Sequence, residues 1–64
     1  MERKVLKDNR FRIIGYIDID SNGDKTLRDS NFMILGYYKN KSDVTKDSHF
    51  MTVGRGDILT SLLK

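Results

Sequence analysis

The chain contains no cysteine, only one histidine and no long apolar run. Without cysteine, neither a disulfide nor a thiolate metal site can support the fold. The single histidine, His49, cannot build a metal site without several carboxylates. No stretch reaches the about 20 apolar residues of a membrane helix, and the N-terminal residues lack the apolar segment of a signal peptide. We therefore expect no membrane segment, no cofactor and a cytoplasmic location, unless an export signal was removed earlier.

The length of 64 residues allows one domain at most, so we expect a single domain over residues 1–64. A chain of this size buries only about 60% of the surface that its unfolded form exposes. Small domains depend on disulfides, metals or self-association for stability, and the first two are disfavoured here. The sequence therefore predicts a homo-oligomer.

The balance of charge is basic, with a formal net charge of +3 and an isoelectric point near 9.4. Acidic residues alternate with the cations over most of the chain, which is typical of a solvated surface. The alternative is a polyanion-binding or nucleic-acid-binding segment, because basic residues near aromatic rings suit phosphates and bases. The candidate cations lie in the first twelve residues: Arg3, Lys4, Lys7, Arg10 and Arg12.

An internal repeat occupies most of the chain, at about residues 5–16, 26–37 and 44–55. Each copy has an aspartate, a phenylalanine three residues later and a glycine four residues after that. The spacing is identical in the copies, and the repeat accounts for every phenylalanine in the chain. Such periodicity indicates one structural unit used several times. The repeated residues are Asp8, Asp29 and Asp47; Phe11, Phe32 and Phe50; and Gly15, Gly36 and Gly54.

Each copy is typical of a β-hairpin. The aspartate and the small polar residues after it form tight turns, because their side chains bind nearby backbone amides. The segment from the phenylalanine onward is rich in β-branched and aromatic residues, which favours a strand with a core phenylalanine. Alternation would place Ile34 and Leu35 on opposite faces, and each repeated glycine would mark an equivalent bend. The predicted fold is all-β, with about three tandem hairpins arranged as a flower or meander.

The tail predicts a short amphipathic helix over about residues 57–64. Asp57 is a suitable N-cap, and apolar residues follow it at one-sided helical spacing. A helix of about two turns is unstable unless it docks. We expect it to dock at the interface between copies.

The repeat resembles that of the five-fold β-flower family, in which a unit built around Gly-Tyr-Ile and Asp-Ser-Asn-Tyr recurs in tandem. The resemblance extends from about Val5 to Arg55, with the third copy the weakest. It implies hairpins that radiate like petals about an axis, and it implies no known activity and no catalytic residue. Members of the family often carry an export signal. The matching residues are Gly15, Tyr16, Ile17, Gly23, Asp29, Ser30, Asn31, Phe32, Leu35, Gly36 and Tyr37, followed by Asp47, Ser48, Phe50, Val53 and Gly54.

The stretch DIDSNGDKTLRD, residues 18–29, has the carboxylate spacing of an EF-hand loop. An EF-hand needs a helix on each side, whereas strand-like sequence flanks this stretch. We therefore interpret it as a polar hairpin turn. A weak calcium site of another kind is the alternative, with the candidate ligands Asp18, Asp20, Asn22 and Asp24.

Nothing in the sequence indicates an enzyme or a small-molecule substrate. His49 occupies a turn position where the sister copies have Arg10 and Asn31, which does not suit a catalytic residue. A chain this small also has little room for an enclosed pocket. We expect a non-enzymatic structural or interaction module that self-associates and displays the turn tips at Asp8, Asp29 and Asp47.

Overall fold

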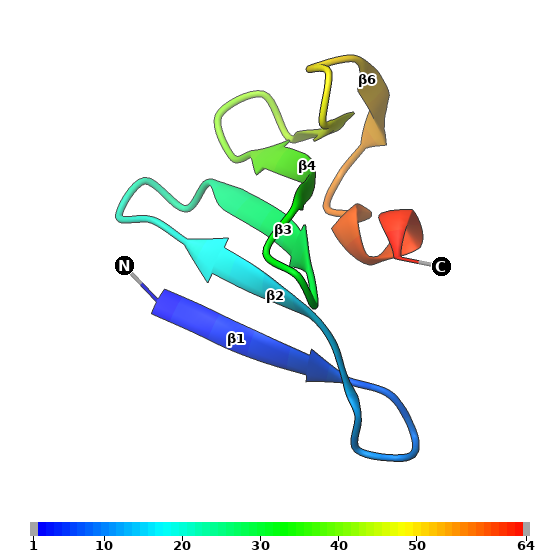
Figure 1. The fold of residues 1–64 in the computed structure, drawn as a ribbon. Coiled ribbons are helices and arrows are strands. Elements are labelled where there is room, and N and C mark those ends of the chain that lie inside the picture. The colour runs from blue at the N-terminus through cyan, green and yellow to red at the C-terminus, as the bar shows by residue number, and fades with distance from the viewer. Residues whose placement is uncertain (1, 64) are drawn as a thin grey trace.

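The computed structural model describes residues 2–63, which form one six-stranded antiparallel sheet. The strands are adjacent in chain order, so the sheet is an open meander (Figure 1). This confirms the predicted all-β class. The strands are β1 (Glu2–Lys7), β2 (Ile13–Ile19), β3 (Lys25–Asp29), β4 (Ile34–Lys39), β5 (Val44–Asp47) and β6 (Thr52–Arg55).

The repeated aspartates build the tips of three hairpins, β1–β2, β3–β4 and β5–β6. In each tip, Oδ1 of the aspartate accepts hydrogen bonds from the backbone amides two and four residues ahead, at 2.8–3.0 Å. The phenylalanine three residues after the aspartate donates its own amide to the aspartate carbonyl. It therefore belongs to the turn, and the second strand of each hairpin begins later than the sequence suggested.

The turn between β2 and β3 has the same construction, which the sequence analysis did not align with the repeat. Asp20 accepts from the amides of Asn22 and Asp24, and Gly23 occupies the place of the phenylalanine. That place requires a left-handed backbone, with φ of +84° at Gly23 and +62°, +66° and +63° at the phenylalanines. Glycine adopts this conformation freely, whereas a phenylalanine there is strained.

A β-bulge precedes each repeated glycine. The pairing of β1 with β2 skips Ile14, that of β3 with β4 skips Leu35, and that of β5 with β6 skips Val53. These are the equivalent bends that the three glycines predicted. The extra residue also reverses the alternation, so Ile34 lies on the opposite face from the one that the sequence predicted.

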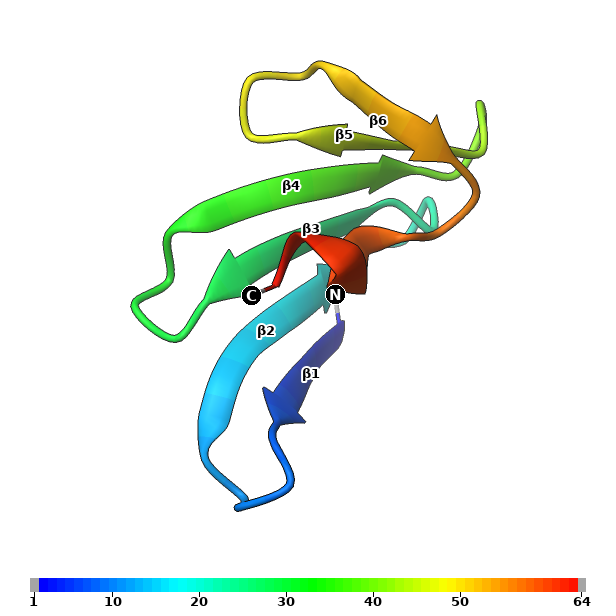
Figure 2. The same cartoon turned by 90° about the vertical axis from the view of Figure 1, so that its right-hand side faces the viewer.

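The sheet has two different faces, which follow from its register. One face, here called the glycine face, contains the three repeated glycines together with the buried Leu27 and Thr45. The C-terminal segment crosses this face, and Figure 2 shows its helical turn in front of the middle strands. The opposite face, here called the aromatic face, contains Tyr16 and Tyr37.

The C-terminal segment forms only a four-residue 3-10 turn, η1 (Leu59–Leu62), so the prediction of an amphipathic helix over 57–64 is wrong for the described residues. Its N-cap is Ile58 rather than Asp57, and Leu63 is already extended. So short a segment cannot hold a regular helix by itself, and its conformation follows its contacts with the sheet. No helix within residues 2–63 is long and apolar enough to cross a membrane.

The repeated glycines make room for this segment. A Cβ atom on Gly36 would lie 2.6 Å from the Lys46 carbonyl oxygen and would overlap the Leu62 side chain. A Cβ atom on Gly15 would lie 2.6 Å from the Arg28 carbonyl oxygen and 3.2 Å from Leu63 Cδ2. The tail therefore docks on the chain's own sheet. The oligomer interface that the sequence suggested for it is not needed to cover its leucines.

The buried apolar core within the described residues is small and consists of Leu27 and Leu59. The prediction that the repeated phenylalanines are core residues is wrong, because Phe11, Phe32 and Phe50 are 81%, 48% and 56% exposed. Their left-handed position lies in the turn, outside the regular strands. The glycines, not the phenylalanines, mark the repeat positions that face the core.

Candidate binding face

The aromatic face presents two stacked pairs of rings among the described residues. Phe32 stacks on Tyr16 with ring centroids 4.5 Å apart, and Phe50 stacks on Tyr37 with centroids 4.6 Å apart. Each phenylalanine lies at the tip of one hairpin. Its tyrosine lies directly after a repeated glycine on the strand that comes before that hairpin, β2 for the first stack and β4 for the second. Stacking of this kind stabilises by about 0.5–1.5 kcal/mol beyond the burial of area.

Two cations lie close to these rings. The Arg3 guanidinium carbon is 5.7 Å from the Tyr16 centroid and 5.3 Å from the Phe32 centroid, and Lys39 Nζ is 5.8 Å from the Tyr37 centroid. These distances suit cation–π attraction. Aromatic rings and cations therefore alternate across this face.

An ion cluster fixes the first stack in place. Asp18 accepts two hydrogen bonds from Arg3, at 2.6 and 3.0 Å, and one from Arg28 at 3.1 Å. The hydrogen bond from Arg3 is the main cause that lowers the pKa of Asp18 below its ordinary value, and the same contact raises the pKa of Arg3. Arg28 also donates to the Phe32 carbonyl, so the cluster ties three strands to the tip of the second hairpin.

The aromatic face is positively charged. By register, the cations of its strands among residues 2–63 outnumber their single carboxylate, Asp18, and the Asp24 carboxylate of the turn after β2 lies 4.0 Å from Lys39 Nζ. Lys46 lies opposite Tyr37, and Arg55 lies opposite Val44 at the far end of the sheet. The cations of this face are Arg3, Lys7, Arg28, Lys39, Lys46 and Arg55.

The basic residues that the sequence singled out are dispersed. Of these, Arg3 and Lys7 belong to the aromatic face by register, whereas Lys4 lies on the glycine face. Arg10 and Arg12 are exposed in the first tip, where Arg12 is 3.7 Å from Asp8. Sequence order grouped these five cations, but the sheet separates them. It brings Arg28 beside Arg3 at Asp18, and it places Lys46 and Arg55 farther across the same face.

The candidate calcium ligands have different partners in the structure. Asp18 is engaged by two arginines, Asp20 caps its own turn, and Asp24 accepts the backbone amide of Asn40. The backbone carbonyl of Asn22 accepts a hydrogen bond from the Asn40 side chain. Within residues 2–63 no three histidine, cysteine, aspartate or glutamate side chains are grouped to hold a metal ion. The interpretation of this stretch as a hairpin turn is confirmed by its register.

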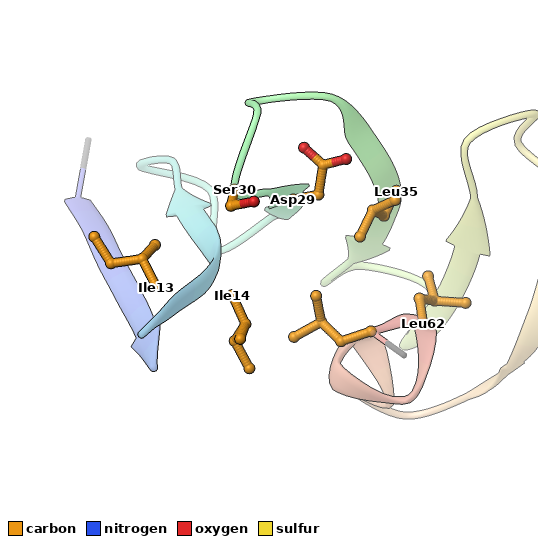
Figure 3. A pocket seen from close by; sticks show the side chains of 7 residues that line it. Ile13, Ile14, Asp29, Ser30, Leu35 and Leu62 are labelled. Carbon is orange, nitrogen blue, oxygen red and sulfur yellow. The ribbon is translucent and has the colours of Figure 1, made fainter. Parts of the chain in front are cut away.

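An open hollow of about 450 Å³ lies between the bulged strands and the C-terminal turn (Figure 3). Its apolar lining includes Ile13 and Ile14 on one side and Leu35 and Leu62 on the other. Its polar side chains are Asp29 and Ser30, and Asp29 is already used to cap its turn. The hollow therefore offers apolar contact but no grouped chemistry.

The other end of the glycine face is closed by polar contacts. Lys25 forms an ion pair with Asp57 and lies 5.6 Å from the Tyr38 centroid. The Tyr38 hydroxyl donates to Asp43 at 2.6 Å, and this hydrogen bond raises the pKa of Tyr38. These contacts hold the chain where it leaves β6 for the C-terminal turn.

Sequence reasoning missed the pairing of phenylalanines with tyrosines. The signal was present, because the residue after the repeated glycine is tyrosine in the first two copies and arginine in the third. No family model matches this chain, and neither a curated protein nor a solved structure matches it. The resemblance to the five-fold β-flower family stays a prediction.

Proposed function

We propose that this chain is a non-enzymatic interaction module whose aromatic face binds a flexible polyanion with planar bases, of the class of single-stranded nucleic acid. The observation that supports the proposal is the alternation of exposed ring stacks and cations on one face of the sheet. Rings stack on bases without regard to sequence, and cations release counterions from the phosphates. The expected binding is therefore non-specific and sensitive to salt.

The geometry favours a single strand over a duplex. The tyrosines of the two stacks lie on β2 and β4, and these strands are two strand spacings apart, or about 9–10 Å. This is nearly three times the 3.4 Å rise between stacked bases. A flexible strand can unstack to place one base on each platform, whereas the bases of a duplex stay paired and hidden.

The side chains that an enzyme could use as acids or bases already have structural roles. The carboxylates of Asp8, Asp20, Asp29 and Asp47 each bind two backbone amides of their own turn. His49 is exposed at a tip, with its backbone amide held by Asp47. These arrangements support a module that binds rather than one that catalyses.

The test is the fluorescence anisotropy of a labelled oligothymidylate titrated with the protein between about 50 and 200 mM salt. We expect binding at the low end, with log K falling by about 0.7 per phosphate contacted as log salt rises. The variant Phe32→Gly with Phe50→Gly should weaken binding, because glycine fits the left-handed turns while the rings are removed. The control Met51→Ala changes a residue beside Phe50 that is at least as exposed as the phenylalanines, and it should bind as the wild type does.

Charge is tested separately with Lys46→Gln and Arg55→Gln, which lie on the aromatic face. Each should weaken binding and reduce its salt dependence, whereas Lys41→Gln in the turn after β4 should do neither. Equal effects of all three substitutions, or no binding at low salt, would overturn the proposal.

Self-association is a second candidate, favoured by the exposure of large apolar side chains around the hollow. Ile13 and Ile14, which line the hollow, are 45% and 39% exposed. Pairing of sheet edges does not favour it, because β1 presents Arg3, Lys4 and Lys7, and charged edges resist addition of a like strand. Light scattering in EDTA and again in calcium tests this candidate: one defined oligomer in both supports it, and a monomer in both contradicts it.

A further inference from the structure

Phe11 has the conformation of its sister phenylalanines but lacks their aromatic partner. Its φ of +62° and its turn hydrogen bonds match those of Phe32 and Phe50. It is nevertheless 81% exposed, and within residues 2–63 no ring stacks on it. The first hairpin therefore presents half of an interface that the other two hairpins complete.

The other two hairpins show what completes it. On the second, Gly15 of the neighbouring strand lies opposite Asp29 and places Tyr16 under Phe32. On the third, a Gly-Tyr pair of β4 does the same: Gly36 lies opposite Asp47. In each of these two hairpins, the first strand thus pairs along its outer edge with a strand that carries a Gly-Tyr pair. For the first hairpin this edge is the outer edge of β1, which pairs with no other described strand.

We propose that the outer edge of β1 and the ring of Phe11 form a docking site for an extended segment of another protein that carries a Gly-Tyr pair. By continuity with the two internal interfaces, the incoming glycine lies opposite Asp8 and the tyrosine lies opposite Lys7, beneath Phe11. The segment adds to the sheet as a further strand, so backbone hydrogen bonds supply affinity and the ring supplies selectivity.

Charge adds a second requirement to the segment. In the internal interface, Asp18 follows Tyr16 by two residues and binds Arg28, the repeat equivalent of Lys7. An acidic residue two positions after the incoming tyrosine would lie diagonally from Lys7, within reach of its ammonium group. The preferred segment is therefore glycine, tyrosine, any residue and an acid.

A second folded copy fits this edge poorly. The strand that it could offer in the same register is β6, where Arg55 stands in place of the tyrosine and would lie opposite Lys7. Like charges directly opposite are destabilising. The chain also leaves the sheet at Gly56, whose φ is +78° and whose amide binds the Asp43 carbonyl.

The experiment uses a synthetic peptide with the sequence of residues 14–20, added to the isotope-labelled protein and followed by amide NMR shifts. We expect shifts in β1 and at the Phe11 tip. A peptide with serine in place of the tyrosine should bind about 2- to 10-fold more weakly, the factor that one aromatic pair contributes. Phe11→Gly should weaken binding to the same extent, and Phe50→Gly should leave it unchanged.

If the free peptide binds too weakly to be followed, a fusion of the same segment to the chain provides a second measurement. Residues 13–24, fused directly before Lys4 in place of residues 1–3, keep the turn between β2 and β3 and set the added glycine opposite Asp8 and the added tyrosine opposite Lys7. This fusion should melt at a higher temperature than the chain that begins at Lys4, and the fusion with serine for tyrosine should raise the melting temperature less. Shifts confined to β6 or to the stacks at Phe32 and Phe50 would overturn the proposal, as would equal binding of the serine peptide. Dimerisation of the protein without peptide through β1 would replace it with a second copy as the occupant. Absence of both binding and stabilisation would also overturn it.

Discussion

Gly36→Ala tests whether the close approach of β5 and of the C-terminal segment requires glycine at this position. The new Cβ would lie 2.6 Å from the backbone carbonyl of Lys46 and would overlap Leu62 Cδ1. A side-chain end can rotate away, but the carbonyl belongs to β5 and cannot move without disturbing the pairing of β4 with β5. The substitution therefore combines a backbone clash with loss of the tail's contact.

The expected cost follows from these contacts. Overpacking in a tight site costs about 1–3 kcal/mol. Replacing glycine by alanine also restricts the unfolded chain, which offsets about 0.4–1 kcal/mol of that cost. A net loss of about 1–2 kcal/mol is large for a chain of this length, whose total stability is about 3–10 kcal/mol at the usual amount per residue.

The measurement is urea unfolding followed by circular dichroism, with Gly54→Ala as the matched control. At Gly54 a Cβ would meet only Ile58 Cδ1, at 2.9 Å, and this flexible end can move aside. We expect the control to change stability by less than about 0.5 kcal/mol. Equal stability of the two variants would refute the view that the close approach of the Lys46 carbonyl requires glycine at position 36.

A double substitution separates the two clashes. If Leu62 is the main obstacle, Gly36→Ala should cost less in a Leu62→Ala background than in the wild type. If the Lys46 carbonyl is the main obstacle, the cost of Gly36→Ala should be the same in both backgrounds. We expect the second result, because the backbone cannot yield as a side chain can.

Three further predictions concern the tips and the ion cluster. Asp47→Ala should lower the free energy of unfolding by about 1–2 kcal/mol in urea titrations, because two backbone amides lose their acceptor, while Ser48→Ala at the same tip should have little effect. Because Arg3 lowers the pKa of Asp18, that carboxylate stabilises the fold above its ordinary pKa of about 3.9, and the stabilisation is lost as pH falls through the lower folded value. Thermal melts from pH 6 down to about pH 2 should show this decline, and Asp18→Asn should flatten it. Phe11→Gly should raise the melting temperature, since it removes left-handed strain of about 1 kcal/mol at a ring without a partner; a lower melting temperature would mean that the ring contacts the fold.

The repeat was readable from the sequence because it rests on local chemistry. An aspartate that binds amides two and four residues ahead needs only its own turn, so Asp8, Asp29 and Asp47 predicted hairpin tips correctly. The related turn at Asp20 escaped notice because Gly23 replaces the phenylalanine there. Both residues serve one left-handed position, and only the backbone angles reveal that they are equivalent.

The faces of the strands could not be read in the same way. Alternation assumes a regular ladder, and one bulged residue in each hairpin reverses it. Because of the bulges at Ile14 and Leu35, the strand residues that precede them in the chain lie on the opposite face from the one that alternation predicts. The prediction of a buried phenylalanine failed for a related reason, because hydrophobicity alone cannot distinguish a core ring from one held out at a tip.

What the sequence determined by itself was the all-β class, the hairpin unit and the place of each bend, since these depend on residues close together in the chain. The tertiary structure decided which residues meet across the sheet. It placed Phe32 on Tyr16, set Arg28 beside Arg3, and laid the C-terminal leucines over the glycines. These contacts join residues far apart in sequence, and they depend on strand register and bulges, which no single segment specifies alone.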